Sequence, residues 1–277
     1  MKIKNFRYSH KYTPPLLISG ILLAAHLSFG ILTGYRKLLI AITASFITEL
    51  ALHRWIVGKW RDMSSAYISG ISVGILIRSP MLWPYALCSM ISIASKYVLR
   101  YKGRHLWNPS NFGVVAMLLL APGSVAVLSI QWGNNMWAMA IIWIVGSISI
   151  YRLRRFHICA TYVISFLAFG LLRSYLTGDP YLAEISPITG PMYQLFTFFM
   201  ITDPKTTVQS KWGQYAVVVA VAFVEMILRL NEAVYAPFYA LFIVGPIALA
   251  FEIWWNDRQN KDELSASSEP STANLSA

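Results

Sequence analysis

The chain has 277 residues, of which 56% are hydrophobic and 13% are charged. Soluble domains carry about 25% charged residues, so this chain has too few charges to cover a surface that faces water. Its net charge is +11. Because the basic residues collect at the ends of apolar runs, we expect the charge to orient the chain in a lipid bilayer, and not to bind nucleic acid.

The apolar runs between charged breaks predict about ten membrane spans, since a helix needs about 20 residues to cross the hydrocarbon core. The candidates are residues 14–35, 38–57, 64–77, 82–99, 111–129, 134–151, 157–175, 188–202, 213–229 and 234–255. We therefore expect an all-α polytopic membrane protein with one transmembrane domain over residues 13–255. A basic segment at 1–12 precedes this domain, and a polar, disordered tail at 256–277 follows it.

Lysine and arginine are concentrated in alternate loops, which predicts that both termini are cytoplasmic in a bacterial-type inner membrane. Ten spans divide into two five-span halves, about 13–131 and 132–255. An odd number of spans in each half would make the two halves antiparallel, or inverted. The third segments of the two halves, 69–80 and 187–204, are both short and interrupted by Gly or Pro. Such a pair is typical of the central site in an inverted-repeat protein.

Small residues recur in the first of these interrupted segments, where Ser69 and Gly70 are adjacent and Gly74 lies about one helical turn after Gly70. Their spacing would allow either a neighbouring helix or a flat ring system to approach the backbone closely. The sequence leaves both interpretations open.

The segment GRHLWNPSNFG, residues 103–113, places polar and helix-breaking residues between two apolar runs. Asn108 before Pro109 predicts an N-cap followed by the first turn of a helix. Cations and amides near a helix N-terminus can hold an anionic group, although they can equally be ordinary loop residues. The candidates of this kind are Lys96, Arg104, His105 and Asn111.

A second polar element, FFMITDPKTT, closes an apolar run with Thr202 and Asp203. A carboxylate at membrane depth favours a functional role, but Asp-Pro also commonly ends a helix. On the predicted second span Glu49 and His53 are four residues apart and share a face, as a satisfied charge pair or as a proton relay. The two cysteines are far apart and form no CxxC motif, so we expect no metal site.

These elements together resemble those of a known family, the RnfD/NqrB family. SAYISGISVGILIRSPMLWPYALCSMISIASKYVLRYKGRHLWNPSNFG is similar to the central signature of the membrane proteins NqrB, from sodium-pumping NADH:quinone reductases, and RnfD, from Rnf complexes. In that family a Gly-rich short span is followed by a Lys-containing helix and an Asn-Pro-Ala-x-x-Gly element, whose places are taken here by Lys96 and residues 108–113. FFMITDPKTT is similar to the family's Phe-Phe-Met-Ala-Thr-Asp-Pro element. The resemblance covers roughly residues 10–255 and is closest to a shorter branch of RnfD-like and UnbU-type proteins of enediyne biosynthesis.

The resemblance implies an accessory electron-transport subunit that binds flavin, works near quinone and belongs to a multi-subunit redox or biosynthetic complex. The residues implied in binding are Ser69, Gly70, Gly74, Lys96, Arg104, Asn108, Asn111, Thr202 and Asp203. The family attaches FMN to a threonine in a Ser-Gly-Ala-Thr element, which this sequence lacks. We therefore expect FMN or riboflavin to bind without a covalent bond. The alternatives are a small-solute channel with urea-channel-like architecture and a cofactor-free scaffold for a biosynthetic partner.

Overall fold

The computed structural model describes residues 19–20, 35–58, 63–127 and 136–268. Within these ranges, the helices long and apolar enough to cross a membrane are Tyr35–Val57, Phe156–Thr177, Lys211–Leu230 and Ala236–Lys261. Shorter apolar helices accompany them at Ser64–Leu76, Pro109–Leu120 and Ile142–Leu153. The chain is therefore a mostly helical membrane protein. The first expected span, 14–35, lies almost entirely outside the described residues.

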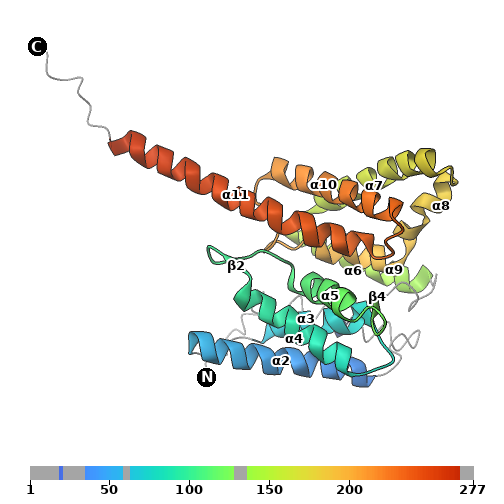
Figure 1. Cartoon of the computed structure of the whole chain (residues 1–277), viewed down its shortest axis with the longest axis horizontal. Coiled ribbons are helices and arrows are strands. Elements are labelled where there is room, and N and C mark those ends of the chain that lie inside the picture. Colours follow the sequence, from blue (N-terminus) through green and yellow to red (C-terminus); the bar gives the residue numbers. More distant parts are fainter. Residues whose placement is uncertain (1–18, 21–34, 59–62, 128–135, 269–277) are drawn as a thin grey trace, which may run out of the picture.

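The first helix group consists of α2 (Tyr35–Val57), α3 (Ser64–Leu76), α4 (Trp83–Val98) and α5 (Pro109–Leu120), which lie together in the lower part of Figure 1. Helix α2 packs against α3 and α4, and α4 packs against α5. The 13 residues of α3 and the 12 of α5 extend about 20 Å and about 18 Å at 1.5 Å per residue. Neither is long enough to cross about 30 Å of hydrocarbon.

Short strands follow both of these half-length helices, a feature that the all-α expectation missed. After α3, β1 (Ile77–Arg78) pairs antiparallel with β4 (Ala126–Val127), which follows α5. The pairing gives hydrogen-bond partners to backbone groups of the segments that follow the two helices, as a membrane interior requires. The expected span at 111–129 thus ends as a helix at Leu120. A second strand pair, β2 (Arg100–Tyr101) with β3 (Arg104–His105), forms a hairpin between α4 and α5.

The second helix group begins with α6 (Met136–Leu153) and α7 (Phe156–Thr177). The interrupted segment then follows as α8 (Tyr181–Ile185), the 3₁₀-helix η1 (Ser186–Thr189), α9 (Pro191–Leu195) and the π-helix η2 (Phe196–Met200). The three pieces from η1 to η2 confirm the predicted break at 187–204. Helices α10 (Lys211–Leu230) and α11 (Ala236–Ser268) complete the group, and α10 packs against both α7 and α11.

Helix α11 is longer than the sequence pattern indicated. It continues to Ser268, so the expectation of a disordered tail beginning at 256 is wrong for residues 256–268. The segment NDRQNKDEL is polar but contains several strong helix formers, so it can prolong a helix that has already started. A polar composition therefore did not mark the helix end.

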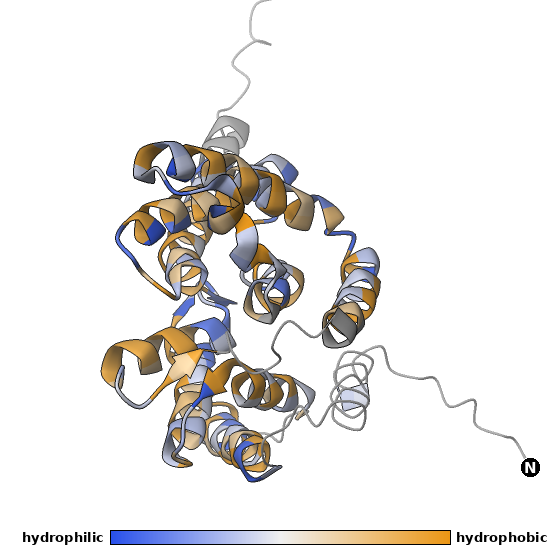
Figure 2. Cartoon of the chain, turned by 90° about the vertical axis from the view of Figure 1, so that its right-hand side faces the viewer, coloured by the Kyte–Doolittle hydropathy of each residue, from blue (hydrophilic) through white to orange (hydrophobic). Residues whose placement is uncertain are grey.

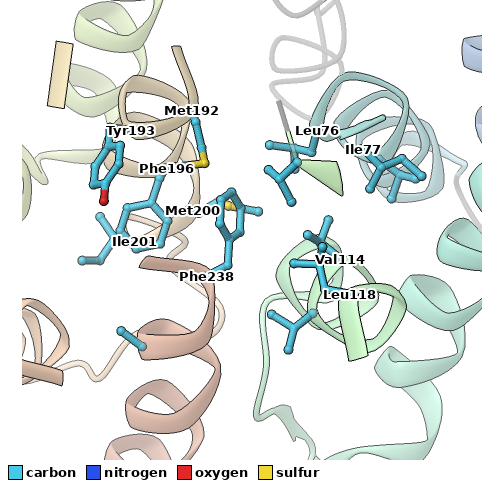
Figure 3. Packing of buried hydrophobic residues seen from close by; sticks show 14 of the residues in the cluster. Leu76, Ile77, Val114, Leu118, Met192, Tyr193, Phe196, Met200, Ile201 and Phe238 are labelled. Atoms are coloured by element: carbon cyan, nitrogen blue, oxygen red, sulfur yellow. The ribbon is translucent and has the colours of Figure 1, made fainter. Parts of the chain in front are cut away.

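Apolar side chains of the two helix groups form one buried cluster between them. Leu76, Ile77, Val114 and Leu118 approach from the first group (Figure 3). The second group contributes Met192, Tyr193, Phe196, Met200, Ile201 and Phe238. Hydrophobic residues also run along the outer sides of the helices (Figure 2). Trp55 is 83% exposed and Trp212 is 82% exposed, both near helix ends, where aromatic rings anchor spans at a membrane interface.

The small residues of α3 lie against α2. A Cβ atom added to Gly70 would lie 2.7 Å from the Ile42 Cα atom, and one added to Gly74 would lie 2.6 Å from the Leu38 Cδ1 atom. Of the two interpretations of this segment, close helix packing accounts for both glycines. Their α2-facing sides are not open to a flat ring.

Gly70→Ala tests this contact. We expect the variant to be less stable by about 1–3 kcal/mol, because the methyl group would overlap backbone atoms of α2. The measurement is thermal unfolding of the detergent-purified protein. Gly123→Ala is the matched control, since an added Cβ there has no heavy atom within 4 Å. Equal unfolding temperatures for the two variants would contradict the packing assignment.

Candidate functional site

The loop and helix start at residues 104–111 connect the first helix group to the second. Trp107 Nε1 donates to the Phe242 carbonyl oxygen at 2.9 Å. Asn111 Nδ2 donates to the Phe238 carbonyl oxygen at 3.2 Å. Further along the same face, Arg104 Nη1 lies 3.4 Å from Glu252 Oε2. The polar segment between two apolar runs thus contacts the other half of the same chain. We call this contact region, between residues 104–111 and the second helix group, the junction.

Asn108 has two roles at this junction. Its backbone is extended, with φ −61° and ψ 122°, as expected before Pro109, and its Oδ1 accepts a hydrogen bond from the Asn111 backbone N–H at 3.1 Å. The N-cap prediction is confirmed. Its Nδ2 donates to Asp203 Oδ2 at 3.1 Å. A single amide therefore caps α5 and joins the two motifs that the sequence singled out, which are 95 residues apart.

Asp203 is held in a tight turn after the π-helix. Its Oδ1 accepts from the Lys205 backbone N–H at 3.1 Å, and its Oδ2 accepts from Thr206 Oγ1 at 3.0 Å. Thr202, which is 1% exposed, donates its hydroxyl to the Phe198 carbonyl oxygen at 2.7 Å. Thr202 thus contributes to the local helix end, whereas Asp203 also reaches the first helix group.

Asn111 retains one acceptor atom without a partner. The residue is 1% exposed, and its Oδ1 accepts no hydrogen bond within the described part of the chain. Leaving a buried acceptor unsatisfied costs about 1–3 kcal/mol. Its sequence neighbour Phe112 belongs to a group of packed rings, in which the Trp107 and Phe112 centroids are 5.6 Å apart and those of Phe112 and Phe242 are 5.5 Å apart. The junction therefore contains both an unpaired acceptor, Asn111 Oδ1, and a group of packed aromatic rings.

Lys96 is engaged elsewhere, with α2 and α3. Its Nζ lies 3.6 Å from Glu49 Oε2 and donates to Ser65 Oγ at 3.2 Å. The Tyr97 hydroxyl donates to Glu49 Oε1 at 2.7 Å and lies 3.4 Å from His53 Nδ1. Glu49 is fully buried and Lys96 is 4% exposed. This ion pair satisfies the charge of Lys96 inside the first group, so Lys96 does not supply a free cation for an anionic ligand.

The nine predicted binding residues therefore divide in two. Those that contact residues within the first group are Ser69, Gly70, Gly74 and Lys96. Those that meet at or beside the junction are Arg104, Asn108, Asn111, Thr202 and Asp203. The junction set carries the candidate site.

The second helix group satisfies its own buried carboxylate. Glu225, 1% exposed on α10, accepts from the Tyr162 hydroxyl at 2.6 Å and from the Tyr193 hydroxyl at 2.8 Å. Arg229 Nη1 donates to the Tyr193 oxygen at 3.1 Å. Near the same end, Arg173 Nε lies 2.7 Å from Glu184 Oε2. Glu225 lies within the predicted span 213–229, where a charge stands out in the sequence, whereas its tyrosine partners do not stand out because tyrosines are common in membrane helices.

Two further basic side chains, His105 and Arg155, lie at or beside the junction. His105 was a sequence candidate for anion binding, whereas Arg155 was not singled out. Burial lowers the pKa of the His105 imidazole, and the nearby cations Arg100, Lys205 and Lys96 lower it further. Burial also lowers the pKa of the Arg155 guanidinium, with Asp203 opposing the shift and Arg104 adding to it. Arginine stays protonated at neutral pH, so Arg155 is a cation whose charge interacts with that of Asp203. Arg155 belongs to the run RLRRF, residues 152–156. The sequence alone does not show which of the three arginines in this run points into the protein.

No model of a known protein family matches the chain, and no curated protein matches its sequence significantly.

Breaking the Glu49–Lys96 pair should be costly. We expect Lys96→Met to destabilise the protein by about 3–5 kcal/mol, since it leaves a buried carboxylate uncompensated, and Glu49→Gln with Lys96→Met to recover part of that loss. The measurement is thermal or denaturant unfolding in detergent. Lys102→Met is the control, because Lys102 pairs with Asp257 at the surface, where such a pair contributes about 0–1 kcal/mol. Similar losses for Lys96→Met and Lys102→Met would disprove the buried pair.

Proposed function

We propose that this chain is an integral-membrane electron-transport protein, similar to RnfD of Rnf complexes and NqrB of sodium-pumping NADH:quinone reductases, that binds a flavin without a covalent bond. The main observation in support is that Asn111 Oδ1 has no hydrogen-bond partner in the described residues, at the junction where Asn108 donates to Asp203. The two elements on which the resemblance rests, 108–113 and 198–204, both contribute to this junction.

The proposed architecture is ten spans in two inverted five-span halves with both termini in the cytoplasm. The order of packing supports it, since α2–α4–α5 in the first group corresponds to α7–α10–α11 in the second. The half-length α3 and the broken segment around α9 and η2 hold corresponding places in the two groups. The junction would lie at the cytoplasmic side, where the sequence concentrates its basic loop residues.

The free acceptor favours flavin as the ligand over quinone. An isoalloxazine ring carries an N–H group between two carbonyl oxygens, so it can donate to Asn111 Oδ1. A quinone ring offers carbonyl acceptors alone and would leave Asn111 Oδ1 unsatisfied. The Trp107, Phe112 and Phe242 rings provide flat apolar surface against which a ring system could pack.

The remaining junction residues would hold and orient the ligand. Asn108 and Asp203 keep α5 and the turn after η2 together, so their bond sets the position of the Asn111 amide. Arg104, tied to Glu252 and to the Thr207 carbonyl oxygen at 3.1 Å, fixes the hairpin beside it. A bound flavin would supply one- and two-electron chemistry, which the protein side chains cannot.

Electrons would have to reach this flavin from outside the chain. The sequence contains two cysteines and no cysteine motif for an iron–sulfur cluster. A redox role therefore requires partner proteins as electron donor and acceptor, with quinone as one candidate acceptor. The working unit we propose is a multi-subunit complex in the membrane.

The visible absorbance of the detergent-purified chain tests this function. We expect a flavin spectrum, either as purified or after incubation with flavin, and release of the flavin into the supernatant on acid precipitation. Asn111→Leu should weaken flavin binding at least tenfold because the acceptor is lost. Asn231→Leu is the control, since Asn231 is an exposed residue that bonds its own helix end.

Other results would assign the chain differently. Protein that binds no flavin but carries a small solute across proteoliposome membranes would support a channel of urea-channel-like architecture. Protein without flavin that co-purifies with a soluble enzyme would support a scaffold. Wild-type flavin affinity in Asn111→Leu would remove Asn111 from the site.

A further inference from the structure

We propose that the junction also contains a phosphate-binding site, formed by Arg155, Arg104 and Lys205, and that the flavin is bound there as its phosphate, FMN, in preference to riboflavin. The inference rests on the proposed function for the identity of the ligand. The phosphate site itself is argued from the charges and contacts of the junction.

The first observation is an excess of positive charge. Four cations interact electrostatically at the junction, with His105 or with one another: Arg100, Arg104, Arg155 and Lys205. The carboxylates that interact with them are Asp203 and Glu252. Lys102 and Asp257 pair with each other and cancel. An anion with one or two negative charges would balance the remaining cations.

The second observation concerns Arg155, which begins α7. Its Nη1 atom is buried and donates no hydrogen bond within the described residues. Asp203 is close enough to affect its pKa, yet no salt bridge joins the two in that part of the chain. A buried guanidinium N–H without an acceptor is costly, and phosphate oxygens are the acceptors that a guanidinium fork fits best.

The third observation is that the carboxylates of the junction are already occupied. Asp203 accepts hydrogen bonds from Asn108, from Thr206 and from the Lys205 backbone N–H. Glu252 accepts from the backbone N–H groups of Gln209 and Ser210 at 2.7 Å and 3.1 Å as well as facing Arg104. Both carboxylates therefore already have hydrogen-bond partners, and neither forms a salt bridge with Arg155 within the described residues.

The fourth observation is the state of His105. Burial and the surrounding cations hold its pKa below the usual value, so it is neutral at pH 7, and its Nδ1 accepts no hydrogen bond in the described chain. After burial, the causes that lower its pKa are the charges of Arg100, Lys205 and Lys96, so this imidazole is surrounded by cations. Two helices, α5 and α7, also begin here, and their N-termini add to that potential.

The proposed phosphate site is connected to the proposed ring site through the hydrogen bonds of the junction. Asp203 links them, because it bonds Asn108, which caps the helix turn that carries Asn111, and because its charge interacts with that of Arg155. A ligand with a ring at one end and a phosphate at the other could use both. A lipid with a phosphate headgroup offers the same anionic chemistry from the bilayer, so the experiment must separate the two sources.

Binding of riboflavin and of FMN to the full-length detergent-purified chain is compared by flavin fluorescence. We expect FMN to bind at least tenfold more tightly than riboflavin, and inorganic phosphate to reduce the difference. Arg155→Gln should abolish the preference for FMN. Lys205→Gln, a change at an exposed position that does not threaten folding, should reduce it. Arg152→Gln, an exposed arginine three residues before Arg155, is the control and should retain the full preference.

A second measurement follows the unfolding temperature with phosphatidic acid or diacylglycerol in the detergent. If no flavin binds but phosphatidic acid alone stabilises the protein through Arg155, the phosphate site stands with a lipid as its source, and the flavin function is overturned. If FMN and riboflavin bind equally and phosphatidic acid has no effect, the phosphate site is overturned while the flavin function stands. No response to any of these probes would overturn both.

Discussion

The side-chain amide of Asn108 is the interaction on which the arrangement of the two helix groups depends. Its oxygen caps α5 and its nitrogen donates to Asp203, so the beginning of one helix and the end of the π-helix are fixed together. Trp107 and Asn111 extend the connection by donating to backbone carbonyl oxygens of α11. In a bilayer, where water is not at hand to satisfy such groups, these bonds also determine where the helices can stop.

Half-length helices make that constraint necessary. Helices α3 and α5 end at Leu76 and Leu120, and the backbone beyond them is paired as β1 with β4. The broken segment of the second group is stabilised instead by a π-helix and by the hydrogen bonds around Asp203. Both solutions give irregular backbone hydrogen-bond partners within the protein, as a bilayer interior requires.

Charges are distributed unevenly between the groups and their junction. Glu49 with Lys96 and Glu225 with two tyrosines are satisfied within their own groups, far along the sequence from one another. At the junction, the carboxylates are already bonded while Arg155 Nη1, His105 Nδ1 and Asn111 Oδ1 have no partner in the described residues. Each such unsatisfied buried group calls for an explanation, and a bound water, ion or ligand is one that would complete its hydrogen bonds.

The sequence by itself determined that the chain is a helical membrane protein, that the segment at 187–204 is broken, and that Asn108 caps a helix at Pro109. Each of these follows from local composition or from the backbone preferences of neighbouring residues. Tertiary structure alone decided that Lys96 pairs with Glu49, that Gly70 and Gly74 pack on α2, and that Asn108 bonds Asp203. Those contacts join residues tens of positions apart, and the side on which a polar residue of a helix or loop finds its partner is set by how the helices pack, which hydropathy and motif spacing do not encode.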